Sequence, residues 1–185
     1  MGLRKLHRYV SLAVSLQLLL WTISGIYFSF NKIENVRGEQ YYKTEEVEEV
    51  ATPINIKKVS KEFAFNVIEE ETLLTPLDME IIEEAKAGSE YRGRDLPLYK
   101  VIAENDKGEE INIYQNPYTG EILAIRSQQW RIWDLMWGLH IMDWNERDNI
   151  GNIFLKIFSF IALFTAATGV ILSLIHISEP TRLRR

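Results

Sequence analysis

The chain has 185 residues, of which 46% are hydrophobic, and it carries 26 acidic residues against 21 lysines and arginines. It contains no cysteine, which excludes disulfides, thiolate metal sites and cysteine nucleophiles. The apolar residues are unevenly distributed, and that distribution is more informative than the average.

Two stretches, 9–30 and 153–175, are almost free of charge, with Lys156 as the one exception. Each is longer than the roughly 20 residues that a helix needs to cross a hydrocarbon core about 30 Å thick. The first is also longer than the apolar core of a signal peptide, and no small-x-small cleavage pattern follows it before Asn31. We therefore predict two transmembrane helices, at 9–30 and 152–174, the first of them uncleaved.

Basic residues predict the orientation of the chain. Arg4, Lys5 and Arg8 immediately precede the first apolar stretch, which favours a cytoplasmic N-terminus at 1–8 and an extracytoplasmic segment between the two helices. Residues 31–150 hold 14 lysines and arginines against 25 acidic residues, a net charge of 14 − 25 = −11. This segment is therefore a poor candidate for binding nucleic acid or anionic lipid.

Residues 31–40 are expected to lead out of the first membrane helix. The acidic run EEVEE at 45–49 follows, and such a run is typical of a solvated connector. From position 55 the apolar spacing becomes three and four residues, at Ile56, Val59, Phe63 and Val67, with Pro53 just upstream. This pattern predicts one helix.

Four strands are predicted next, at 79–87, 96–103, 110–115 and 121–127. The connections at 105–108 (NDKG) and 116–120 (NPYTG) have the residues of tight turns. The predicted fold of 31–128 is therefore an α+β domain with one helix on an antiparallel meander.

Tryptophans dominate the segment before the second membrane helix. In a helix, six residues would lie within roughly 100° of one another: Trp130, Trp133, Trp137, His140, Ile141 and Trp144. Tryptophan favours the membrane–water interface, so we predict a Trp-rich interfacial helix at 129–145.

Small residues follow one face of each apolar stretch. They are Ser11, Ser15, Thr22, Gly25 and Ser29 in the first, and Ser159, Ala162, Ala166, Gly169 and Ser173 in the second. Such faces favour close packing of helices in lipid, either as an antiparallel pair or across a dimer.

Three segments resemble the PepSY-associated transmembrane family. NPYTGEIL at 116–123 is similar to the strand–turn–strand signature of PepSY domains, residues 3–30 are similar to the family's opening helix, and WGLHIMDW at 137–144 is similar to the segment before the later helix of its short members. The resemblance covers residues 3 to about 174. By contrast, the end of the chain, LIHISEPTRLRR, resembles a translated sequencing adapter, so we expect 175–185 to be non-native and give His176 no weight.

The resemblance implies a bacterial inner-membrane protein whose PepSY module serves as a non-enzymatic accessory or regulatory partner of a peptidase or another envelope protein. Larger members look like haem-containing reductases linked to iron or siderophore uptake, but this chain has only two apparent crossings. The alternative function is therefore a small b-type haem electron-transfer protein or subunit. A third alternative, binding of a cation or a cationic peptide, rests only on the acidic charge.

His7 and His140 are the candidate haem ligands. They lie near opposite ends of a span of roughly 30 Å, so they could bind one haem b only by pairing with their symmetry mates in a homodimer. The alternatives without a cofactor are that His7 is a polar residue at the membrane interface and that His140 is a polar residue on the tryptophan-bearing face of the predicted helix at 129–145.

No catalytic motif occurs in the central domain, since it has neither GxSxG nor HExxH. The acidic residues Asp78, Glu80, Glu83 and Glu84 are expected to be solvated. A partner-binding edge is predicted at Tyr91, Arg92, Arg94 and Tyr118, because an exposed strand can accept a second chain.

Overall fold

The computed structural model describes residues 2–43 and 57–178. They form two compact units: a helical unit made of 2–27 and 137–178, and a sheet unit made of 28–43 and 57–136. Each is described by itself, and the residues outside the described ranges include the acidic run and most of the suspected non-native tail.

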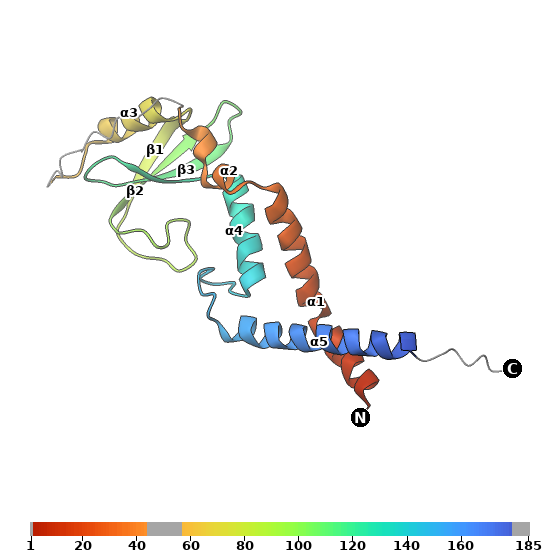
Figure 1. Ribbon diagram of the computed structural model, residues 1–185. Helices are drawn as coiled ribbons and strands as arrows, with labels where there is room; N and C mark the ends of the chain where they lie inside the picture. Colours follow the sequence, from red (N-terminus) through yellow and green to blue (C-terminus); the bar gives the residue numbers. More distant parts are fainter. Residues whose placement is uncertain (1, 44–56, 179–185) are drawn as a thin grey trace. The chain divides into compact units, whose positions relative to one another are not determined.

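The sheet unit is built on a four-stranded antiparallel meander in the order β1-β2-β3-β4 (Figure 1). The strands are β1 (Thr75–Ile82), β2 (Leu98–Glu104), β3 (Glu110–Gln115) and β4 (Ile122–Arg126). The three later strands confirm the prediction to within two residues. The first was placed too late, because β1 already begins at Thr75, where Pro76 and an irregularity between Pro76 and Asp78 interrupt the pairing with β2.

Both predicted turns are present. The N–H of Gly108 donates to the carbonyl of Asn105 at 3.0 Å, and the N–H of Gly120 donates to that of Asn116 at 2.8 Å. Both glycines have positive φ, at 74° and 79°, which is the conformation that glycine adopts at little cost.

One helix, α3 (Lys61–Glu71), lies on the sheet (Figure 1). The hydroxyl of Ser60 caps it by accepting from the N–H of Phe63 at 3.2 Å. The prediction that the helical pattern already includes Val59 was wrong, because the N–H of Val59 donates instead to the carbonyl of Pro117 at 2.8 Å. Ala64 and Ile68 are the buried residues of α3.

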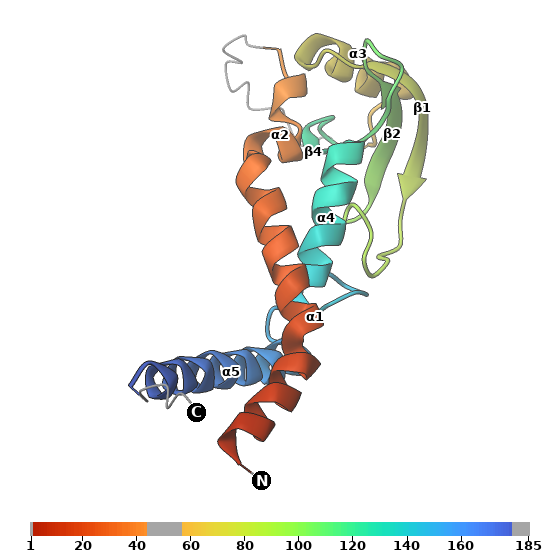
Figure 2. The ribbon, with the colours of Figure 1, turned by 90° about the vertical axis from the view of Figure 1, so that its right-hand side faces the viewer.

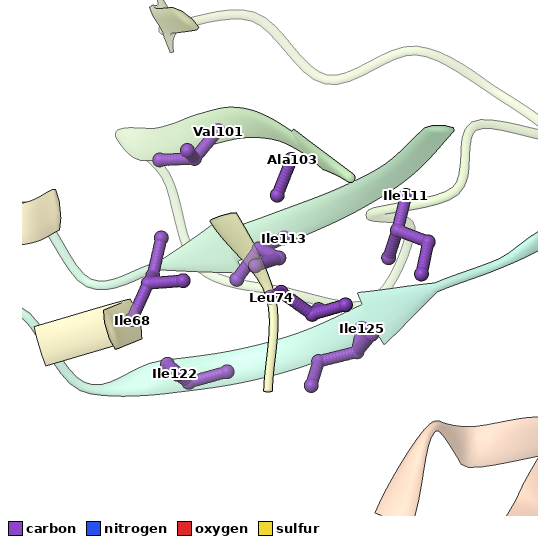
Figure 3. Packing of buried hydrophobic residues seen from close by; sticks show 8 residues of the cluster. All are labelled: Ile68, Leu74, Val101, Ala103, Ile111, Ile113, Ile122 and Ile125. Carbon is purple, nitrogen blue, oxygen red and sulfur yellow. The ribbon is translucent and has the colours of Figure 1, made fainter. Parts of the chain in front are cut away.

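The core of the sheet unit lies between α3 and the strands (Figure 3). Each aliphatic side chain of this kind contributes roughly 1.5–3 kcal/mol when it is fully buried. The members are Ile68, Leu74, Val101, Ala103, Ile111, Ile113, Ile122 and Ile125.

The segment predicted as a plain exit is instead helical, with α2 (Ile33–Arg37) followed by the short 3-10 helix η1 (Glu39–Tyr41). Gly38 joins them at φ 87°, and a Cβ built there would lie 2.8 Å from Cβ of Ile125 on β4. Because Gly38 has no side chain, the end of α2 packs directly against β4.

Three helices supply the helical unit: α1 (Leu3–Phe30), the last turn of α4 (Gln128–Ile141), and α5 (Ile153–Ser178). Only 17% of the apolar window of α1 and 6% of that of α5 is buried inside the protein. Such long, exposed apolar surfaces are those of helices that face lipid.

Inside the helical unit, the last turn of α4 lies beside the middle of α1 (Figure 2). The indole N–H of Trp21 donates to the carbonyl of His140 at 2.7 Å, and the side-chain amide of Gln17 donates to that of Leu139 at 3.3 Å. These bonds satisfy two of the carbonyls that a helix end leaves open. The predicted helix at 129–145 is shorter, because α4 ends at Ile141 and Met142 has a positive φ of 57°, so Trp144 lies outside it. The interfacial location of this Trp-rich helix stays a prediction.

The predicted pairing of small-residue faces is not seen along the two long helices. A Cβ built on Gly25 would meet nothing within 4 Å, while one built on Gly169 would lie 3.4 Å from the ring of His7. A homodimer using these faces stays a prediction.

Candidate functional site

A polar network surrounds Glu90, which lies between β1 and β2. Its carboxylate accepts from Nε of Arg131 at 2.6 Å, from the amide of Asn112 at 2.7 Å and from the hydroxyl of Tyr114 at 3.1 Å. Its backbone carbonyl accepts from Nε of Arg126 at 3.1 Å. The carboxylate of Glu90 thereby links the segment between β1 and β2 to β3 and α4, and its backbone carbonyl links the same segment to β4.

The network shifts the pKa values of its members. Burial favours a higher pKa for Glu90, but the hydrogen bonds from Arg131 and Asn112 and the charge of Arg131 outweigh it, so the pKa lies below its ordinary value. Burial also raises the pKa of Tyr114, and the neighbouring charge of Glu90 adds to that rise. At neutral pH, Glu90 is therefore ionised and Tyr114 is neutral.

A second charged pair adjoins this network. Arg92 forms an ion pair with Asp134, whose side chain is only 1% exposed. The guanidinium groups of Arg92 and Arg126 also lie over the ring of Trp130, at 5.6 and 4.5 Å from its centroid. This is cation–π geometry, and it stacks two cations against one aromatic side chain.

A pocket of about 400 Å³ opens beside Arg126. Its charged lining consists of Arg37, Arg94 and Arg126 together with Glu39, and its remaining lining is apolar or aromatic: Ile33, Val36, Tyr42, Leu123, Ala124, Ile125, Trp130 and Trp133. Burial, followed by the positive charge of Arg94, lowers the pKa of Arg126 to about 10. The pocket is therefore electropositive, and it is the feature of the sheet unit best suited to hold an anion.

Two of the four residues predicted to form a partner edge, Tyr91 and Arg92, are bonded within the protein. The hydroxyl of Tyr91 donates to the carbonyl of Glu84 at 3.1 Å, and Arg92 is held by Asp134. Arg94 and Tyr118 do come together, as lining residues of a second pocket of about 290 Å³. Binding of a partner by any of the four stays a prediction.

Sequence reasoning missed Arg37, Arg126 and Trp130 as site residues. Arg126 and Trp130 are four residues apart, but they lie on different elements, so helical spacing gives no reason to pair them. Arg37 lies at 31–40, which was expected only to lead out of the first membrane helix. Arg94, Trp130 and Trp133 were singled out in the sequence, but for a partner edge and for an interfacial helix.

Three of the four acidic residues expected to be solvated are exposed, and each of the three pairs with a lysine. Lys100 pairs with Glu80 at 2.7 Å, Lys61 with Asp78 at 3.2 Å and Lys58 with Glu83 at 3.3 Å. Among residues 2–43 and 57–178, no three His, Asp or Glu side chains are placed to hold a metal ion.

His7 lies on α1 and contacts α5. Its Nδ1 is 2.7 Å from the hydroxyl of Thr168, and its Nε2 is 3.4 Å from that of Ser11. Both ring nitrogens thus have hydroxyl neighbours, which is what an interfacial polar residue needs.

His140 lies at the end of α4 against α1. Its Nδ1 is 2.8 Å from the hydroxyl of Ser24, and its ring is stacked with Trp137 at a centroid distance of 6.3 Å and 10° between planes. A hydrogen bond at Nδ1 fixes the orientation of an imidazole, as it does for many metal-bound histidines.

The two histidines do not fit one haem within a chain. His140 contacts α1 at Ser24, which lies roughly 25 Å along the helix from His7 at a rise of 1.5 Å per residue. Two axial nitrogens on one iron lie only about 4 Å apart. A haem held by two histidines would therefore need one histidine from each of two chains, either two copies of His7 or two copies of His140.

Comparison with known proteins gives one match. The family described as PepSY-associated TM region matches residues 4–185. No curated protein and no solved structure gives a significant match. The family match covers nearly the whole chain and agrees with the two exposed apolar helices, so this membrane protein belongs to the PepSY-associated TM family.

Proposed function

We propose that this protein is a membrane-anchored PepSY module that acts, without catalysis of its own, as an accessory or regulatory partner of another envelope protein. The proposal places it in a bacterial inner membrane, with its N-terminus in the cytoplasm and its sheet unit outside. Family membership supports the PepSY assignment, and one feature of the sheet supports a role in binding a partner.

That feature is the edge strand β1. In the sheet formed by the described residues, β1 and β4 are the two terminal strands, and β4 is covered where α2 and Gly38 pack on it. β1 instead carries exposed apolar side chains, with Leu77 51% and Ile81 42% exposed. An edge of this kind can accept a strand from another protein through backbone hydrogen bonds.

The beginning of β1 is poorly suited to pair with a strand from another chain. Pro76 has no N–H to donate, and the pairing with β2 is irregular between Pro76 and Asp78. Strand addition is therefore confined to the second half of β1, from Asp78 to Ile82.

Site-specific photo-crosslinking in the native membrane tests the proposal. A benzoyl-phenylalanine at Ile81 should give a discrete adduct containing a second envelope protein, whereas the same group at Lys107, in the turn between β2 and β3, should not. A Met79→Pro substitution should reduce crosslinking at position 81. Adducts of equal yield at both positions, or none at position 81, would contradict a partner at this edge.

A second candidate function is that of a small b-type haem electron-transfer protein or subunit linked to iron or siderophore reduction. The hydrogen bond between Nδ1 of His140 and Ser24 favours it, because it orients the ring as a second-shell bond orients a metal ligand. Haem bound in a dimer would supply the redox centre, and His140 with its symmetry mate would hold it.

The visible spectrum of the detergent-purified protein separates the two candidates. Expression with haem supplementation should give a sharp absorption band on dithionite reduction if the second candidate is right, and His140→Ala should abolish that band while His7→Ala spares it. Protein that remains colourless under these conditions rules this candidate out and leaves the accessory module.

A further inference from the structure

The 400 Å³ pocket is a local exception to the charge of its surroundings. Residues 31–150 have a net charge of −11, yet the pocket is lined by three arginines and a single carboxylate, that of Glu39. The net charge led to the expectation that this segment avoids anionic lipid. A local potential is set by the nearest charges, however, and here those are positive.

Two of the three arginines have their charged groups available. The guanidinium groups of Arg37 and Arg94 are exposed and make no hydrogen bond or ion pair with the described residues. Arg126 lies deeper, with Nε bonded to the carbonyl of Glu90 and another nitrogen to that of Ile125.

The pocket is also close to the end of a membrane-spanning helix. Ile33, one of its lining residues, is three residues beyond Phe30, where α1 ends, so even an extended chain puts the two within roughly 10 Å. The headgroup layer extends roughly 5–8 Å beyond the hydrocarbon on each side. Trp133 lines the same pocket and packs on Phe28 of α1 at 5.3 Å, and tryptophan is typical of this layer.

We propose that this pocket binds the phosphate of an anionic phospholipid in the adjoining leaflet. Guanidinium groups match the oxygens of a phosphate and can bind them with two hydrogen bonds each. The apolar lining, which includes Ile33, Leu123 and Trp133, accommodates the glycerol and the first methylenes of the acyl chains. The lipid thereby bridges α2 and β4 on one side and the start of α4 on the other.

Titration of the full-length protein in a non-ionic detergent tests this proposal, with tryptophan fluorescence as the readout. Short-chain dioctanoyl phosphatidylglycerol should bind saturably, and dioctanoyl phosphatidylcholine, which carries the same phosphate without net charge, should bind several-fold more weakly. Arg37→Gln and Arg94→Gln should each weaken phosphatidylglycerol binding about tenfold, which corresponds to about 1.4 kcal/mol.

Lys107→Gln is the matched control, since it removes one positive charge from the exposed turn between β2 and β3. It should leave the affinity unchanged, and circular dichroism should show that all three variants keep the fold. Equal loss in the control and the pocket variants would show a nonspecific charge effect and overturn the proposal.

Two further titrations distinguish other occupants. Inorganic phosphate that binds as tightly as phosphatidylglycerol would reassign the pocket to a soluble anion, and a peptide with a free C-terminal carboxylate that binds more tightly would reassign it to a protein ligand. Either result overturns the lipid assignment. Weak binding of both, with Arg-dependent binding of phosphatidylglycerol, supports it.

Discussion

At the scale of single residues, Glu90 carries the most connections in the sheet unit. Replacing it with glutamine removes the charge that pairs with Arg131, and breaking such a partly buried pair from one side costs about 2–4 kcal/mol. We expect Glu90→Gln to lower the apparent Tm of the full-length protein in detergent at pH 7. Lys100→Gln, which breaks the more exposed pair with Glu80, should have a much smaller effect.

The same substitution has a predictable pH dependence. Because the pKa of Glu90 lies below its ordinary value of 4.5, its ionised form stabilises the fold above about pH 4.5, and that contribution is lost as the pH falls through the folded-state pKa. The difference in Tm between wild type and Glu90→Gln should therefore shrink as the pH is lowered from 7 to below 4. A difference that stays constant over this range would show that the charge of Glu90 is unimportant.

Gly38 is a residue whose replacement the backbone tolerates poorly. Its φ of 87° strains any other residue, and a Cβ there would lie 2.8 Å from Cβ of Ile125. Gly38→Ala should therefore destabilise the sheet unit by about 2–4 kcal/mol in thermal unfolding. Gly93 provides the control: its φ is 72° but its Cβ would meet nothing within 4 Å, so Gly93→Ala should cost only about 1 kcal/mol.

At the scale of elements, Asn152 joins the end of α4 to the start of α5. Its oxygen accepts from the N–H of Leu155 at 2.9 Å, as an N-cap does, and its amide donates to the carbonyls of Ile141 and Asn149, each at 2.8 Å. Asn152→Ala should destabilise the helical unit by about 1–2 kcal/mol in thermal unfolding. Asn152→Ser keeps the capping oxygen and loses only the amide, so it should recover part of that loss; equal stability of all three proteins would exclude the role.

At the scale of the whole molecule, the absence of cysteine makes the membrane topology directly testable. A single cysteine at Lys107 should react with a membrane-impermeant maleimide in intact cells, because the proposal places the sheet unit outside. A cysteine at Lys5 should react only after lysis, because residues 1–8 are expected in the cytoplasm. The reverse pattern would invert the topology while leaving the fold unchanged.

The sequence predicted regular elements well where one local rule dominates. The turns at 105–108 and 116–120 are specified by glycine at positions that need positive φ, and the later strands lie between those turns. It predicted the start of β1 and of α3 less well. Val59 fits a helical spacing, but its N–H donates to the carbonyl of Pro117 and its carbonyl accepts from the hydroxyl of Tyr99, and both partners are distant in the chain.

The candidate site was predicted only in part. Arg94 and Tyr118 were singled out, and they do line one pocket, but Tyr91 and Arg92 were grouped with them although each is engaged elsewhere. The 400 Å³ pocket was missed because its arginines and tryptophans come from α2, from the segment before β2, from β4 and from α4. No local pattern in the sequence predicts that these four segments lie side by side.

The sequence by itself determined the two apolar helices, the antiparallel meander and the family to which the chain belongs. Apolar length, alternation and turn residues are short-range properties, so each can be read from a window of the chain. The tertiary structure decided where charge is concentrated and which histidine contacts which helix. Those properties depend on residues far apart in the chain being brought within a few ångströms, where Coulomb interactions and hydrogen bonds become strong.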